Sequence, residues 1–279
     1  MLGVLKMDID TCISSYRDLA PKIFPEEGFL SSKKLVKLFK GLKGIARFDA
    51  TNLESAVKEM VASTMNSEDA VLENEEIVCR TFVCVTNKNI GKPFRLRNYR
   101  SSWEPSTHCT VWQAARATSA CPLYFPSIQL GTPPATYVDG GLNYNNPVRA
   151  LYDEANHVWG KSSRRIKCII SIGTGVPPLK AAGDTGKEIV ESLISIALDT
   201  QKIADEFADE MGHLNTPGEG LKYVRLNVSH GLESMKLEEW KDFDLLTGAT
   251  NYYLNSHKRE VEQCADALLD VGGTDVGGT

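Results

Sequence analysis

The sequence predicts an α/β fold with a largely parallel central sheet. Helical and strand-like patterns alternate along the 279 residues, as they do where helices connect parallel strands. The segment 166–175 is an apolar run that enters a glycine turn, which is typical of a strand covered by helices on both faces. A second strand pattern, 135–139, ends on a turn formed by Asp139, Gly140 and Gly141. These observations indicate a layered domain with a carboxylate at one strand end.

The periodicity places each element in order. Apolar residues spaced three and four apart predict helices over 8–24, 31–46, 50–65, 110–120, 148–158, 185–211 and near 251–269. Runs rich in apolar and β-branched residues predict strands over 76–86, 93–99, 135–139, 166–172 and 221–228. The tail 271–279 repeats Val-Gly-Gly-Thr and is expected to be flexible.

The Asp139-Gly140-Gly141 turn is the strongest candidate for a functional site. Because glycine has no Cβ, both glycines can adopt left-handed or strained dihedrals and allow close approach of backbone or ligand. The polar segment 142–146 is expected to continue as a loop, and Pro147 suits the first turn of the next helix. Since Asp-Gly is a common turn dipeptide, a plain connection is the alternative interpretation.

Two neighbouring segments strengthen the functional interpretation. The small-residue helix over 111–121 stops at Pro122, and the strand over 166–172 runs into the sequence Ser-Ile-Gly-Thr-Gly of residues 171–175. Together with the turn at Asp139, these motifs resemble the patatin-like phospholipase family in order and spacing. The resemblance extends from about residue 1 to about residue 230.

This resemblance implies a three-layer patatin-like fold and an activity. The family's chemistry is hydrolysis of phospholipid or acylglycerol esters in lipid degradation, through a Ser-Asp dyad in which Asp139 would be the general base. Neither a metal nor an organic cofactor is implied. We expect a patatin-like core over 1–155, the remainder of the same α/β domain over 156–270, and a tail over 271–279.

The serine of such a dyad is missing from these residues. The family's nucleophile lies in a Gly-x-Ser-x-Gly turn, downstream of a glycine-rich loop that serves as oxyanion hole. No serine of the chain has glycines at both flanking positions, and Ser171 has them on one side only. We therefore expect an N-terminally incomplete chain that lacks the first strand or strands and the nucleophile elbow. Whether it is an enzyme stays open, because a non-catalytic lipid-binding or regulatory protein or fragment is the alternative.

Other side chains give weaker signals. The five histidines follow no recognisable triad or metal-ligand spacing. Tyr124 and Phe125 are candidates for lining an acyl path, and core aromatics are the alternative. Five lysines and no acid occur over 31–43, which suits either an anionic lipid surface or an ordinary solvated helix.

Composition restricts partners and location. A formal net charge of −5 argues against a nucleic-acid partner. The sequence contains no long apolar run that would predict a membrane span or a secretion signal. The seven scattered cysteines indicate reduced thiols rather than a disulfide framework. We expect a cytoplasmic protein, peripheral to membranes at most, that meets a lipid or membrane-surface ester substrate. Fused or partner domains are not predicted either way.

Overall fold

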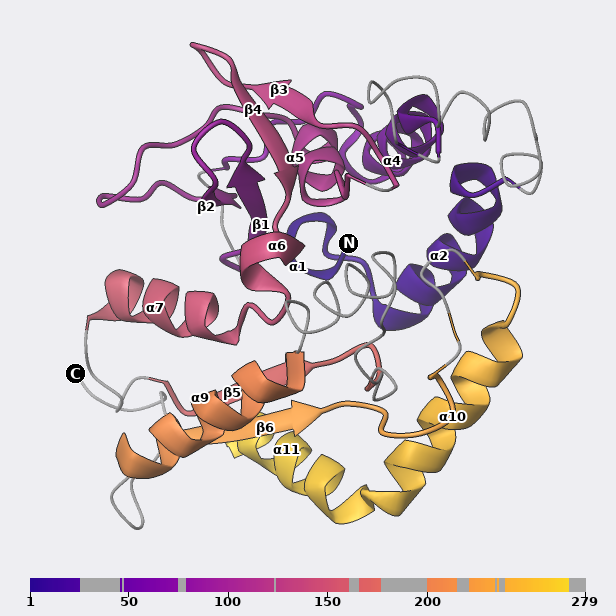
Figure 1. Cartoon of the computed structure of the whole chain (residues 1–279), viewed down its shortest axis with the longest axis vertical. Helices are drawn as coiled ribbons and strands as arrows, with labels where there is room; N and C mark the ends of the chain where they lie inside the picture. Colours follow the sequence, from indigo (N-terminus) through magenta and orange to yellow (C-terminus); the bar gives the residue numbers. More distant parts are fainter. Residues whose placement is uncertain are drawn as a thin grey trace, which may run out of the picture. The chain divides into compact units, whose positions relative to one another are not determined.

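A computed structural model describes most of the chain in two compact units, Met1–Tyr144 and Asn145–Thr279 (Figure 1). The described residues are 1–25, 46, 48–74, 79–122, 124–160, 166–176, 200–214, 221–233, 235 and 239–270. The predicted helix over 31–46, which includes the lysine-rich segment 31–43, lies outside them except for residue 46. The tail 271–279 also lies outside them. The proposed division into 1–155 and 156–270 stays a prediction.

The first unit contains a four-stranded sheet with the order β2-β1-β4-β3. Its strands are β1 (Phe82–Asn87), β2 (Lys92–Arg97), β3 (Ile128–Leu130) and β4 (Ala135–Asp139). Each neighbouring pair is antiparallel, so the expectation of a largely parallel central sheet is not confirmed. The physical reason is the length of the connections. Residues 88–91 and 131–134 join β1 to β2 and β3 to β4, and connections this short fit antiparallel strands only.

The described helices of the first unit are α1 (Leu2–Leu5), α2 (Ile9–Ile23), α4 (Ala50–Met65), α5 (Val111–Thr118) and α6 (Gly141–Tyr144). Three of them, α2, α4 and α5, begin at side-chain caps. Asp8 and Asp49 accept hydrogen bonds from the first-turn amides of α2 and α4. At α5, the Thr110 hydroxyl and the Gln113 side chain form a reciprocal capping box. The predictions of helices over 8–24, 50–65 and 110–120 are confirmed to within a few residues.

Small residues bring α5 close to the sheet. Ala114, Ala117 and Ala120 are at most 2% exposed, and α5 contacts α4, β1 and β4. Figure 1 shows α5 beside β4. The Thr118 hydroxyl donates a 2.7 Å hydrogen bond to the Cys84 carbonyl, which joins the end of α5 to β1. This packing fixes the end of β4, where Asp139 lies.

The second unit is built around a parallel strand pair, as the sequence predicts for this region. It contains β5 (Cys168–Ile172) and β6 (Lys222–Leu226), with the helices α7 (Val148–Trp159), α9 (Thr200–Leu214), α10 (Phe243–Ser256) and α11 (Lys258–Asp270). The helix predicted near 251–269 is therefore two helices, because the backbone leaves the helical conformation at His257. Buried apolar side chains of α7, α9 and both strands form a separate core.

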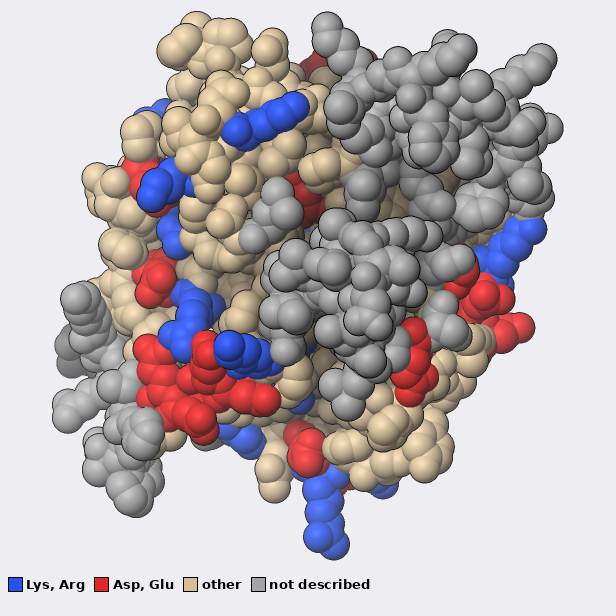
Figure 2. Space-filling model, viewed as in Figure 1, with Lys and Arg blue, Asp and Glu red and all other residues tan. Residues whose placement is uncertain are grey.

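Charged side chains of both signs occupy the surface over α7 and α9 (Figure 2). Arg149 of α7 forms an ion pair with Glu210 of α9, and Lys202 faces Glu206 one turn further along α9. Mixed charge of this kind keeps helix surfaces solvated. No helix among the described residues is both long enough and apolar enough to cross a membrane.

Candidate active site

Asp139 is the last residue of β4, and backbone contacts on two sides hold it there. In the sheet it lies opposite Val85 of β1. Its own N–H donates a 3.1 Å hydrogen bond to the carbonyl of Ala120, just beyond the end of α5. The structure thus has this carboxylate at the end of a strand, as predicted. Pairing with β1 and the contact with α5 together set where the carboxylate lies.

The two glycines that follow have different roles. A Cβ built at Gly140 would lie 2.5 Å from the Cys84 carbonyl carbon and 2.7 Å from Cys84 Cβ, so no side chain fits there. Neither Gly140 nor Gly141 is among the glycines with positive φ. Two reasons for glycine were predicted here. The structure shows the close backbone approach at Gly140, and it shows no left-handed backbone at either glycine.

The Gly141 amide orients the carboxylate. Its N–H donates a 2.5 Å hydrogen bond to Asp139 Oδ1. Gly141 is also the first residue of α6, so part of the segment expected to be a loop is a short helix. The sequence did not signal this helix because Asn143, Asn145 and Asn146 are residues typical of turns.

Burial changes the chemistry of this carboxylate. Asp139 is half-buried, and burial raises the pKa of its carboxyl group above the usual value, while the hydrogen bond from Gly141 N–H opposes the increase. A carboxylate with a raised pKa is a stronger base. The arrangement can therefore accept a proton from a hydroxyl group or a water molecule.

Side chains that the sequence analysis did not identify hold α6 beside the sheet. Asn143 Nδ2 donates a 3.0 Å hydrogen bond to Thr86 Oγ1 on β1. Arg95 on β2 donates to the Tyr144 hydroxyl over 3.4 Å, with its guanidinium carbon 5.8 Å from the centre of the Tyr144 ring. These contacts join residues about 50 positions apart, and no local sequence pattern predicts them.

Tyr124 and Phe125 lie in an aromatic cluster of the first unit's core, as the alternative interpretation expects. Phe48 stacks on Tyr124 at 6.1 Å between ring centres, and Phe125 lies 6.0 Å from both Phe48 and Phe24. The buried guanidinium of Arg116 lies beside the Phe125 ring, 5.8 Å from its centre. The structure therefore assigns these aromatics to packing.

Ser171 lies in the second unit and takes part in a buried polar network. Its Oγ accepts a 2.7 Å hydrogen bond from Arg225 and donates to Asn146 Oδ1 over 3.3 Å. Asn146 Nδ2 in turn donates to the carbonyl of Thr200. Both hydrogen-bonding directions of the Ser171 hydroxyl are used, which suits a structural role.

The histidines and cysteines form no metal centre in the described part of the chain. His157 and His257 each place Nδ1 within hydrogen-bond distance of a carbonyl one helical turn earlier. None of the seven cysteines forms a disulfide. No group of three or more His, Cys, Asp or Glu side chains with metal-binding geometry occurs among the residues that the structure describes.

Comparison with known proteins identifies a family and several relatives. The profile of the family "Patatin-like phospholipase" matches residues 8–152, a range that includes Asp139. Calcium-independent phospholipase A2-gamma of Rattus norvegicus is 29% identical over 213 residues, covering 73% of this chain and 26% of the relative. The human protein of the same name is 30% identical over 181 residues, covering 63% and 22%. Phospholipase A I of Arabidopsis thaliana is 26% identical over 252 residues, covering 70% and 19%. The matched part of this chain thus spans 26% and 22% of the length of the first two relatives and 19% of the length of the third.

Proposed function

The chain belongs to the patatin-like phospholipase family, and on that premise we propose that it serves in hydrolysis of phospholipid or acylglycerol esters, with Asp139 as the general base of a Ser-Asp dyad. The observation that carries the proposal is the half-buried Asp139 carboxylate at the end of β4. Its pKa is raised by burial and its orientation is set by the Gly141 amide. The names of the relatives, two of them phospholipases A2, support a lipid ester as substrate.

The carboxylate has a defined part in this chemistry. Gly141 N–H binds Asp139 Oδ1, so Oδ2 is the oxygen that takes the proton of a serine hydroxyl as the serine attacks the ester carbonyl. The protonated Asp139 then gives that proton to the departing alcohol, which leaves an acyl-enzyme. In the second half of the reaction the same carboxylate deprotonates a water molecule, whose oxygen attacks the acyl carbonyl. Asp139 then returns the proton to the serine oxygen as the bond between serine and the acyl group breaks and the fatty acid leaves. Because the pKa of Asp139 is raised, proton acceptance is more favourable than for an aspartate in water.

The nucleophile has to come from a Gly-x-Ser-x-Gly turn, and these 279 residues contain none. This sequence observation favours a second candidate function, a non-catalytic protein that binds lipid or regulates a lipid enzyme. The two candidates differ in what happens when a nucleophile is supplied. If the chain carries a working base, an added serine elbow with its oxyanion loop should create an esterase.

The experiment compares two proteins. One is the 279-residue chain alone, and the other is the same chain preceded by a strand, a glycine-rich loop and a Gly-x-Ser-x-Gly turn. We expect fatty-acid release from phosphatidylcholine vesicles by the extended protein and negligible release by the chain alone, because the nucleophile and oxyanion donors supply most of the rate enhancement. Replacing the added serine by alanine is the control. Vesicle binding without hydrolysis by a well-folded extended protein would favour the non-catalytic function.

We also propose a cytoplasmic location at the periphery of membranes. Seven cysteines without a disulfide support a reducing compartment, and the proposed substrate class supports contact with a lipid surface. Fractionation of cells that express the tagged chain tests this. Recovery of the tagged chain in the culture medium would contradict a cytoplasmic location.

A further inference from the structure

The parallel pair β5–β6 has two faces with different surroundings. Cys168 lies opposite Lys222 in the register, and Ile169 lies opposite Tyr223. Because side chains alternate along a strand, these two pairs point to opposite faces. Ile169 and Tyr223 pack against α9, where Tyr223 meets the Phe207 ring at 5.0 Å between centres. Cys168 and Lys222 therefore point to the face away from α9.

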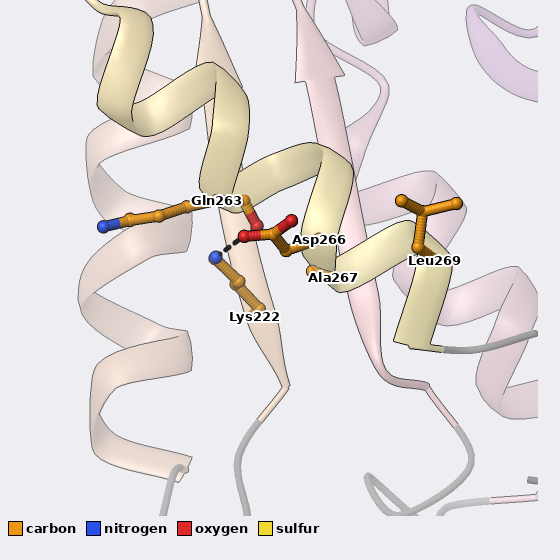
Figure 3. Close-up of a pocket in the computed structure, with 5 residues that line it drawn as sticks. All are labelled: Lys222, Gln263, Asp266, Ala267 and Leu269. Atoms are coloured by element: carbon orange, nitrogen blue, oxygen red, sulfur yellow. Dashed lines mark hydrogen bonds between the residues drawn. The ribbon is translucent and has the colours of Figure 1, made fainter. Parts of the chain in front are cut away.

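Helix α11 covers that second face. The Lys222 ammonium donates a 2.6 Å hydrogen bond to the carbonyl of Gln263, one residue before Cys264 (Figure 3). Cys264 is 6% exposed, and α11 has Cα atoms within 8 Å of β5 and of β6. The thiols of Cys168 and Cys264 thus belong to one interface between the strand pair and α11.

No other cysteine belongs to the second unit. The remaining five are in the first unit, at positions 12, 79, 84, 109 and 121. A pocket of about 420 Å³ is lined by Lys222 of β6 and by Gln263, Asp266, Ala267 and Leu269 of α11 (Figure 3). Cys168 itself is half-buried, so a small oxidant can reach its thiol.

We propose that Cys168 and Cys264 form a redox pair that closes a disulfide between β5 and α11 on exposure to a peroxide. The Cys168 thiolate attacks one oxygen of hydrogen peroxide, giving Cys168 sulfenic acid and, after proton uptake, one water molecule. The Cys264 thiol then attacks the Cys168 sulfur, which forms the S–S bond and releases a second water molecule. In total, two thiols and one hydrogen peroxide give one disulfide and two water molecules. A disulfide needs Cα atoms about 4.4–6.8 Å apart, and α11 and β5 have Cα atoms within 8 Å of one another at this interface.

The roles of the two cysteines follow from their surroundings. Cys168 is half-buried and Cys264 is buried, so Cys168 is the cysteine that meets the oxidant first. Burial raises the pKa of Cys168, the Cys264 thiol raises it further, and Lys222 lowers it in part. Because the thiolate is the reactive form, oxidation should accelerate as the pH rises above neutrality.

The inference does not depend on the proposed activity, and it is tested on the 279-residue chain. The reduced protein is treated with hydrogen peroxide at a small molar excess, its free thiols are blocked with an alkylating reagent, and unreduced peptides are mapped by mass spectrometry. We expect a peptide that links positions 168 and 264 as the main disulfide product, faster at about pH 8.5 than at pH 7. Dithiothreitol should reverse the cross-link. The cross-linked protein should also unfold several degrees higher than the reduced protein, since the bridge restricts the unfolded chain.

Two variants separate this pair from general thiol oxidation. Cys264→Ala should abolish the intramolecular cross-link and leave Cys168 as a sulfenic acid that dimedone traps. Cys121→Ala, in the first unit, should leave the cross-link unchanged. If the main product in the wild-type protein linked any other pair, or if Cys264 stayed fully alkylable while Cys168 was oxidised, the inference would be wrong. Because that mapping uses the wild-type chain, it decides the matter even if Cys264→Ala folds poorly.

Discussion

Gly140 packs directly against the backbone of Cys84, with no room for a side chain between β1 and the turn after β4. A Cβ at position 140 would come within 2.5 Å of the Cys84 carbonyl carbon. The same carbonyl group accepts the hydrogen bond from Thr118 at the end of α5. One peptide group of β1 thus sets both the helix end and the turn that carries Asp139. This contact explains why the candidate base is followed by glycine.

Replacing Gly140 by alanine should destabilise the protein. The added methyl group meets backbone atoms of β1, which cannot rotate away, so the expected loss is about 1–3 kcal/mol. Thermal unfolding followed by circular dichroism measures it. Gly248→Ala in α10 is the matched control, since a Cβ there meets nothing within 4 Å and alanine favours the helix. Equal melting temperatures for Gly140→Ala and Gly248→Ala would show that the turn adapts freely.

The raised pKa of Asp139 makes a prediction about stability and pH. Burial makes the folded protein hold the Asp139 proton more tightly than the unfolded chain does, so ionising this group costs stability. That cost is absent below the unfolded-state pKa of about 3.9 and appears as the pH rises through and above it. Asp139→Asn, which keeps an oxygen for the Gly141 amide, should therefore be more stable than the wild type at pH 7.

Unfolding of both proteins from about pH 3.5 to pH 7 measures this difference, and the advantage of Asp139→Asn should shrink towards the acid end. A wild-type protein that is the more stable of the two at pH 7 would contradict the raised pKa.

The buried Arg116 guanidinium should make its partner Glu54 important for stability. Arg116 is 2% exposed, and its charge is balanced by Glu54, 3.2 Å from Nε, with a further hydrogen bond to the Pro126 carbonyl. Glu54→Ala leaves the buried cation without its carboxylate, and we expect a loss of about 1–3 kcal/mol.

Glu59→Ala supplies the comparison, because Glu59 pairs with Lys22 at the surface, where both side chains are more than half exposed. That variant should change stability by about 0.5 kcal/mol or less. Similar losses for Glu54→Ala and Glu59→Ala in urea unfolding would mean that burial of Arg116 adds nothing to its ion pair.

The sequence predicted the elements better than their pairing. The periodicity identified the helix at 50–65 and the strand at 135–139 with the bounds that the structure has. It says nothing about which strands pair, and the alternation of helices and strands suggested parallel pairing that the first unit does not have. Gly91 and Gly131, both with positive φ, lie in the two short turns. These glycines were the available signal for antiparallel hairpins.

The sequence predicts only those residues of the candidate site that are adjacent along the chain. Asp139 and its glycines are adjacent in sequence, so a strand followed by Asp-Gly-Gly locates the carboxylate. The contacts that hold it, from Ala120 and across to Cys84, come from distant segments. The shift in the Asp139 pKa depends on burial by that packing, which periodicity does not supply.

The role of Asp139 as base is tested most directly in the extended protein that carries the serine elbow. Asp139→Asn should lower kcat for a phospholipid or p-nitrophenyl ester by about a hundredfold or more, as removal of a general base does. Asp18→Asn, an exposed change on α2, should leave kcat unchanged. An Asp139→Asn protein that is folded and hydrolyses the ester at the wild-type rate would show that Asp139 is not the base.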